Sequence, residues 1–166
     1  SSSAASDVYK RQNLSPYQNV MNVARKKGEA VASLFPNDVV LSTDTIVCLD
    51  GKIYGKPKDR KDAYNTLATF SGMTHEVVSG VSIISKKLNM TMYVKSYVTF
   101  KKLTKEMIDD YLKTDEPYDK AGSYAIQGEG RSLIEGYSGS LDNIIGLPIE
   151  YIKDMLRVML NEVENR

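Results

Sequence analysis

The order of apolar and polar residues predicts a helix that begins near residue 15. Ser15 suits the helix cap, Pro16 suits the first helical position, and Gln18 can close a capping box with Ser15. The apolar residues that follow lie near one face of this helix: Val20, Ala24, Val31 and Leu34. We interpret the basic stretch 25–27 as a solvated face of the helix rather than as a binding site.

Segments rich in β-branched and aromatic residues predict strands at 39–49, 75–84 and 93–100. The dipeptide Asp50-Gly51 follows the first of them and predicts a tight hairpin turn, because both central residues of such a turn take positive φ. The chain is then expected to return antiparallel. The polar stretch between the second and third segments predicts a loop that joins a long antiparallel pair.

Further helices are predicted to start at Asp59, after Thr104 and at Pro148, and Ser71-Gly72 supplies a stop for the first of these. Interleaved strands and helices are typical of an α/β or α+β layered domain. Of the two we expect an α/β fold, with a mixed, partly antiparallel sheet flanked by helices.

The composition narrows the class of protein. The 166 residues, 42% of them hydrophobic, suffice for one folding unit, either compact or split into two lobes around a cleft. Lys and Arg total 22 against 21 acidic residues, so no global field recruits nucleic acid or a membrane, and local cations must hold any anionic ligand. The lone Cys48 excludes an internal disulfide, fits a reducing compartment and predicts a buried structural thiol.

Residues 1–12 are polar and aperiodic and lack the apolar centre of a signal peptide. We therefore expect a non-native or disordered tail at 1–12 and a folded domain at 13–166. No stretch of the sequence reaches membrane-spanning length, and a cytoplasmic protein is expected.

Asp44 is the first candidate for chemistry. It stands in the sequence STDT, between the apolar pieces VVL and IVCL. A carboxylate in an apolar strand loses hydration unless it faces a cleft or a cation. The alternative is a turn in which Asp44 is a solvated cap, and this feature alone favours that alternative.

Lys56 is the second candidate. In the segment GKPKD at 55–59, Pro57 stiffens the loop and would present Lys56 on a fixed backbone to a phosphate. The same segment is also explained as the lead-in to a helix with Asp59 as its cap.

The segment DKAGSYAIQGEG at 119–130 is the third candidate. Its glycines let the backbone approach a ligand, Lys120 supplies charge, and Gln127 can donate and accept hydrogen bonds, which suits a base edge. The segment lacks the residue order of a Walker loop and, by itself, predicts only a loop.

The residues available for metal binding exclude one kind of site. One histidine and one cysteine exclude a zinc cage, whereas Asp44 together with phosphate oxygens suits Mg²⁺ or Mn²⁺. His75 lies beside a predicted strand, and we interpret it as a structural or surface residue.

Four motifs in this order resemble the Maf family, whose members are nucleoside triphosphate pyrophosphatases. The motifs are STDTIVCLDGKIYGKPKD, FSGMTHEVVSGVSI, EPYDKAGSYAIQGEG and NIIGLP, and the resemblance covers about Leu14 to Leu160. A chance match of four separated motifs in one order is far rarer than a match of any one. The resemblance implies two lobes around a central cleft.

By this resemblance Asp44 is the family's catalytic proton acceptor. Water would attack the α-phosphorus, and the products would be pyrophosphate and a nucleoside monophosphate. Asp44 would also share a divalent cation, Mg²⁺ or Mn²⁺, while Lys56 and Lys120 would offset charge on the phosphates.

The resemblance also implies a branch of the family. Asp44-Thr45 and the sequence Ile-Gln-Gly around Gln127 match the branch that acts on dTTP and UTP. The 7-methyl-GTP branch tends to carry Asp-Gln and Ser-Glu-Gly at these places. Thr45 and Gln127 are therefore the expected specificity residues.

Family members normally begin with a strand, a Ser-x-Ser-Pro-Arg-Arg-like loop, a helix and a metal-holding glutamate, and nothing before Leu14 matches these. We therefore expect a chain that is N-terminally truncated relative to the family, without its first strand, phosphate loop and first helix. The activity of such a chain is an open question.

Two other functions stay open. One is a pyrophosphatase for 7-methyl-GTP or other modified purine nucleotides, and the other is a non-catalytic nucleotide-binding regulator of cell division. The expected partner is a nucleoside triphosphate, with neither nucleic acid nor membrane, and a homodimer is left open.

Overall fold

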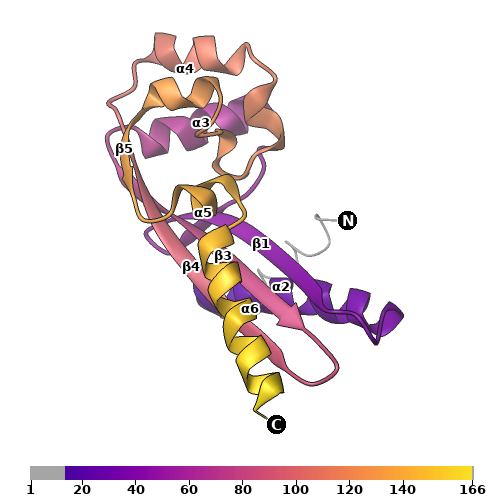
Figure 1. Ribbon diagram of the computed structural model, residues 1–166. Helices are drawn as coiled ribbons and strands as arrows, with labels where there is room; N and C mark the ends of the chain where they lie inside the picture. The colour runs from indigo at the N-terminus through magenta and orange to yellow at the C-terminus, as the bar shows by residue number, and fades with distance from the viewer. Residues whose placement is uncertain (1–13, 166) are drawn as a thin grey trace. The chain divides into compact units, whose positions relative to one another are not determined.

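The computed structural model describes residues 14–165 (Figure 1). The α-helices are α2 (Pro16–Leu34), α3 (Arg60–Phe70), α4 (Lys105–Leu112), α5 (Leu141–Ile145) and α6 (Ile149–Glu164). The strands are β1 (Val40–Leu49), β2 (Lys52–Tyr54), β3 (Thr74–Ile84), β4 (Asn89–Phe100) and β5 (Ile134–Ser138). Short 3-10 helices lie in and beside residues 119–130, which we call the glycine-rich segment: η1 (Glu116–Asp119), η2 (Ala121–Ser123) and η3 (Glu129–Leu133). The predicted tail at 1–12 lies outside the described residues.

Polar side chains set where the helices begin. Ser15 accepts a hydrogen bond from the Gln18 amide at 3.2 Å, and Gln18 Oε1 accepts one from the Ser15 amide at 3.0 Å, so the predicted capping box is confirmed. Asp59 caps α3 by accepting from the Asp62 amide at 2.8 Å. Thr104 caps α4 in the same way.

The strands form one five-stranded sheet in the order β2-β1-β3-β4-β5. β1 and β2 pair antiparallel across the predicted turn, in which φ is 50° at Asp50 and 80° at Gly51. β4 and β5 also pair antiparallel. The predicted α/β fold, with a partly antiparallel sheet flanked by helices, is confirmed.

The described chain divides into two compact units, which agrees with the prediction of two lobes. Unit 1 holds the described residues up to Thr45, together with Ser79–Val94 and the chain from Gly146 onward. Unit 2 holds Ile46–Val78 and Lys95–Ile145. The strands β1, β3 and β4 each contribute residues to both units.

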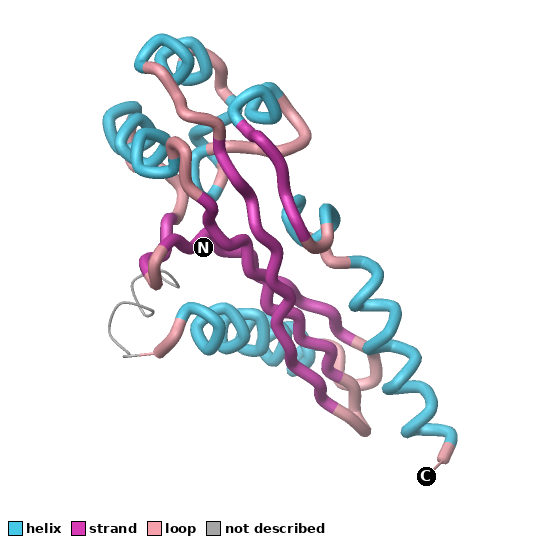
Figure 2. Tube along the Cα trace, turned by 90° about the vertical axis from the view of Figure 1, so that its left-hand side faces the viewer, coloured by secondary structure: helices cyan, strands magenta, loops and turns pink. Residues whose placement is uncertain are grey.

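In unit 1, α2 and α6 lie on opposite sides of the strands (Figure 2). Gly80 of β3 meets α2 so closely that a Cβ atom there would stand 2.4 Å from the carbonyl oxygen of Val20. The next residues that face the other side, Val81 and Ile83, pack in an apolar cluster with α6. The residues that α6 contributes to this cluster are Ile152, Met155 and Met159.

The buried part of α2 ends earlier than its apolar stripe. The buried residues are Asn19, Val20, Ala24 and Gly28. Val31 and Leu34 continue the stripe by helical spacing, yet they are 45% and 74% exposed. The packing of α2 therefore depends on its first half and on Gly28.

Unit 2 has its own apolar core, to which α3, α4 and parts of the strands contribute. At its centre the rings of Phe70 and His75 stack with centroids 4.4 Å apart, and Phe100 and Tyr124 meet the same group edge to face. α3 also packs against η2, which brings the glycine-rich segment onto this core.

Some boundaries differ from the predictions. β4 begins at Asn89 rather than near residue 93, because Met90 and Met92 alternate with exposed residues and pack against the cluster of unit 1. The elements β5 and α5 were not predicted, since each spans only five residues and shows too little periodicity.

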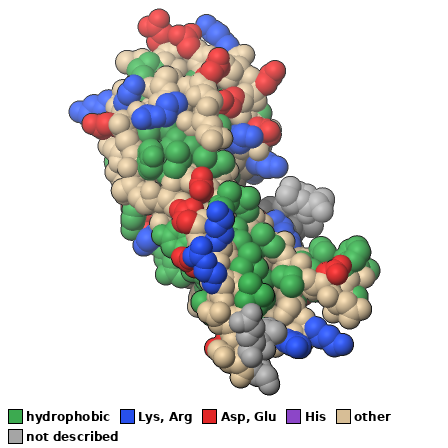
Figure 3. Space-filling model, viewed as in Figure 1, with side chains coloured by type: hydrophobic (Ala, Val, Ile, Leu, Met, Phe, Trp, Pro, Cys, Tyr) green, Lys and Arg blue, Asp and Glu red, His purple; other side chains and the backbone are tan. Residues whose placement is uncertain are grey.

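On the face shown in Figure 3, acidic and basic side chains are interspersed, in keeping with the formal net charge of +1. Within residues 14–165, no single helix is both long enough and apolar enough to cross a membrane.

Candidate active site

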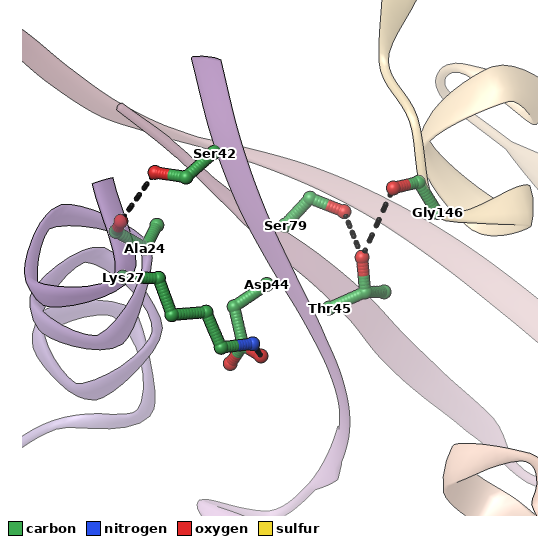
Figure 4. A network of polar contacts seen from close by, with 7 residues as sticks. All are labelled: Ala24, Lys27, Ser42, Asp44, Thr45, Ser79 and Gly146. Carbon is green, nitrogen blue, oxygen red and sulfur yellow. Dashed lines mark hydrogen bonds and ion pairs between the residues drawn. The ribbon is translucent and has the colours of Figure 1, made fainter. Parts of the chain in front are cut away.

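Asp44 lies inside β1, so the interpretation of this residue as a turn cap is wrong. Thr43 and Thr45 flank it, and β-branched residues favour extended backbone. The side chain of Asp44 is 19% exposed, and its Oδ1 lies 2.8 Å from Lys27 Nζ (Figure 4). A cation at this distance offsets the hydration that a carboxylate loses when it is partly buried.

Lys27 is a candidate site residue that the sequence pattern did not single out. It belongs to the basic stretch that was interpreted as solvated, and its side chain is 48% exposed. The signal was its position: it lies next to Gly28 and three residues after Ala24, at the border of the buried stripe of α2. A lysine there can reach the strand that the helix covers.

Close contact between α2 and β1 fixes this pairing. The hydroxyl of Ser42 donates to the carbonyl oxygen of Ala24 (Figure 4). A Cβ atom at Gly28 would stand 2.7 Å from Ser42 Oγ and 3.0 Å from a methyl group of Ile84, so only glycine fits here without displacing a neighbour. The backbone carrying Lys27 is thereby held beside the backbone carrying Asp44.

Thr45 points in a different direction from Asp44, as neighbouring strand residues do (Figure 4). Its Oγ1 lies 2.8 Å from Ser79 Oγ and donates to the carbonyl oxygen of Gly146 at 3.4 Å. These contacts join three of the four motifs in unit 1. They also fix the orientation of the Thr45 hydroxyl.

Lys56 and Lys120 belong to unit 2, where one backbone hydrogen bond joins their loops: the Gly122 amide donates to the Gly55 carbonyl oxygen at 3.2 Å. Gly122 has a φ of 72° and packs against Val47, where a Cβ atom would stand 3.0 Å from a methyl carbon. Both lysines are exposed, and Lys120 Nζ lies 3.3 Å from a carboxylate oxygen of Asp119. The loops that carry the two lysines are therefore adjacent in unit 2.

Gln127 is also exposed and lies in a turn of unit 2, in which the Gly128 amide donates to the Ala125 carbonyl oxygen at 3.4 Å. Its buried neighbour Ile126 packs in the core of the unit. Gln127 is thus presented to solvent from an anchored turn.

His75 and Cys48 are both buried, as was predicted for Cys48, and of the two interpretations of His75, structural or surface, its burial favours the structural one. His75 is 1% exposed, and its Nε2 lies 2.6 Å from the hydroxyl oxygen of Tyr124. Burial lowers the pKa of His75 to about 4. Burial, reinforced by the charge of Glu76, raises the pKa of the Cys48 thiol, which keeps it in the unreactive form.

The donors present fit a hard cation held mainly through phosphate. Among the residues that the structure describes, no three His, Cys, Asp or Glu side chains gather as a metal cage would require. Mg²⁺ is commonly bound through one or two carboxylates together with substrate phosphates and water. The carboxylate of Asp44 suits that mode of binding.

Known proteins resemble this chain over most of its length. The family described as "Maf-like protein" matches residues 2–159. A dTTP/UTP pyrophosphatase of Bacillus pumilus is 46% identical over 138 residues, which are 83% of this chain and 73% of that protein.

Two further relatives carry the same name. The Clostridioides difficile protein is 45% identical over 144 residues, or 86% of this chain and 74% of the relative. The Latilactobacillus sakei protein is 40% identical over 151 residues, or 91% of this chain and 83% of the relative. With the family match over nearly the whole chain and relatives at this level of identity, the protein is a member of the Maf family.

Proposed function

We propose that this protein is a nucleoside triphosphate pyrophosphatase that hydrolyses dTTP and UTP to the monophosphate and pyrophosphate. The names of its relatives support this activity. The observation that carries the proposal is the pair of Asp44 and Lys27, whose charged atoms lie 2.8 Å apart on two closely packed elements.

Asp44 is the proposed catalytic base. Its carboxylate takes a proton from water, the water oxygen forms a bond to the α-phosphorus, and the bond from the α-phosphorus to the bridging oxygen breaks. Pyrophosphate leaves with the electron pair of that bond. Lys27 is the proposed positioning residue for Asp44, because its ammonium group donates to Oδ1 and limits the rotation of the carboxylate.

The remaining site residues are proposed as substrate contacts. Lys56 and Lys120 offset phosphate charge, and Thr45 and Gln127 contribute to the choice of base. A divalent cation, Mg²⁺ or Mn²⁺, would be held through the carboxylate of Asp44 and would supply further charge compensation on the phosphates.

We also place the activity in the cytoplasm, where its triphosphate substrates occur and where a buried thiol such as Cys48 stays reduced. A homodimer is a further proposal, which sedimentation velocity at several protein concentrations would decide.

Pyrophosphate release from dTTP, UTP, 7-methyl-GTP and inosine triphosphate, under one magnesium concentration, tests the function. We expect dTTP and UTP to be turned over faster than the two purine nucleotides. Asp44→Asn should lower kcat by roughly 10²- to 10⁴-fold, the range of a lost general base. Equal turnover of all four nucleotides would contradict the pyrimidine assignment, and faster turnover of the two purine nucleotides would favour the modified-purine alternative.

Binding of dTTP without release of pyrophosphate, unchanged in the Asp44→Asn variant, would instead favour the regulator of cell division. That outcome would remove the catalytic role of Asp44.

A further inference from the structure

The carboxylate of Glu116 accepts three hydrogen bonds around the glycine-rich segment of unit 2. Oε1 accepts from the Glu129 amide at 3.0 Å. Oε2 accepts from the Gly130 amide at 2.8 Å and from the hydroxyl of Tyr111 at 2.6 Å. A charged acceptor makes such bonds stronger than a neutral one does. Glu116 therefore holds the backbone that follows Gln127.

Tyr111 ties the backbone on the other side of Gln127. Its hydroxyl oxygen accepts from the Ala125 amide at 3.2 Å while its hydrogen goes to Glu116. Tyr111 is a buried residue of α4, so it is fixed by the core of the unit. The hydrogen-bonded pair of Glu116 and Tyr111 thus binds the backbone on both sides of the turn that carries Gln127.

The glycines of the segment leave room for this pair. A Cβ atom at Gly128 would stand 1.5 Å from Glu116 Oε1, inside the volume of the carboxylate. A Cβ atom at Gly130 would stand 2.5 Å from the Ala125 carbonyl oxygen and 2.9 Å from the Tyr111 hydroxyl. A side chain at residue 128 would push the Glu116 carboxylate away from the turn, and one at residue 130 would displace the turn backbone at Ala125 as well as the Tyr111 hydroxyl.

We propose that Glu116 is the positioning residue of Gln127: with Tyr111 it fixes the turn of residues 125–130, so that Gln127 is presented in one orientation to the base of the nucleotide. This inference rests on the proposed function, in which Gln127 contacts the substrate. Glu116 itself touches backbone amides and a phenol and takes no part in the chemistry.

Glu116→Gln tests the role with little change in size. The amide supplies one acceptor oxygen and turns an NH₂ group toward backbone donors, so at least one of the three bonds is lost. We expect kcat/KM for dTTP to fall about tenfold, as loss of one hydrogen bond allows, mainly through a higher KM with kcat nearly unchanged. The matched control is Glu106→Gln, which changes an exposed carboxylate of α4 and should have no effect.

A double-mutant cycle separates positioning from mere stability. If Glu116 acts through Gln127, then adding Glu116→Gln to a Gln127→Ala variant should lower kcat/KM for dTTP little further, because both substitutions remove the same contribution to kcat/KM. Gly128→Ala, which displaces the carboxylate from the other side, should reproduce the KM effect of Glu116→Gln. Additive effects of Glu116→Gln and Gln127→Ala, or a fall in kcat alone, would overturn the proposal.

Amide hydrogen exchange gives a readout that does not depend on turnover. We expect the amides of Glu129 and Gly130 to exchange faster in Glu116→Gln than in Glu106→Gln, and equal exchange would overturn the proposal. If the wild-type chain releases no pyrophosphate from dTTP or UTP, the proposed function fails. Faster exchange of the Glu129 and Gly130 amides in Glu116→Gln would in that case show that Glu116 stabilises the turn without any role in substrate binding.

Discussion

At the scale of single residues, the structure draws attention to Lys27, which the sequence pattern did not single out. It pairs with Asp44 although half of its side chain is exposed. Lys27→Met keeps most of the length of the side chain and removes the charge, so the carboxylate loses its anchor. We expect kcat for dTTP to fall at least about tenfold, which corresponds to about 1.4 kcal/mol of transition-state stabilisation.

Lys26→Met is the matched control, because Lys26 is the exposed neighbour on the same helix. Equal loss of kcat in both variants, measured by steady-state pyrophosphate release, would show that net charge rather than the contact with Asp44 matters.

His75 supports a prediction about pH. Its pKa is about 4 in the folded protein because it is buried, against roughly 6.5 in an unfolded chain. Above about pH 6.5 both states are neutral at this site. As the pH falls from about 6.5 to about 4 the unfolded state gains the proton first, so the free energy of unfolding decreases, by about 3 kcal/mol in all.

Urea unfolding at several pH values checks this, and NMR can follow the single histidine directly. A midpoint for His75 near 6.5 in the folded protein would contradict the account. A His75→Gln variant should lack this part of the acid destabilisation.

Residue patterns pointed to some residues of the candidate site and not to others, for physical reasons. Asp44 stood out because a carboxylate interrupts apolar sequence, although local patterns could not distinguish a turn from a strand. The partner Lys27 lies 17 residues away in sequence, and only helix packing brings it near. Glu116 opens the third family motif, but no local pattern indicated its role, since its hydrogen-bond partners are mostly backbone amides.

At the scale of elements, the packing of α2 on β3 depends on Gly80. A methyl group there would stand 2.4 Å from the Val20 carbonyl oxygen, and backbone cannot move aside as a side chain can. We expect Gly80→Ala to destabilise the protein by about 1–3 kcal/mol, the usual cost of overpacking. Gly136→Ala is the control, because Gly136 is also a strand glycine but has open space around it.

The measurement is urea unfolding of both variants. Equal stability of Gly80→Ala and Gly136→Ala would contradict the close packing of α2.

Prediction of the helices and strands succeeded where contacts between residues close in sequence decide where an element begins or turns. Ser15, Asp59 and Thr104 each cap the helix that was predicted to follow them, and Asp50-Gly51 turns as expected. It failed for β5, whose partner β4 is distant in sequence and whose five residues include a glycine. Pairing of this kind is decided by the whole sheet and leaves little trace in local sequence.

At the scale of the whole molecule, the order of four motifs indicated the family, and the family match confirms it. That match covers residues 2–159, so it begins earlier in the chain than Leu14, where the resemblance of the motifs began. The α/β fold could be predicted because strands and helices alternate along the chain, and the local patterns had already indicated most of these elements. The proposed residues are divided between the units: Asp44, Thr45 and Lys27 belong to unit 1, and Lys56, Lys120 and Gln127 belong to unit 2.

The central claim is that Asp44 directs water onto the α-phosphorus. Hydrolysis of dTTP in water enriched in oxygen-18, followed by mass spectrometry of both products, tests it most directly. The account predicts label in the nucleoside monophosphate and none in the pyrophosphate, with labelled product almost absent in the Asp44→Asn variant. Label in the pyrophosphate, or an undiminished rate in Asp44→Asn, would contradict it.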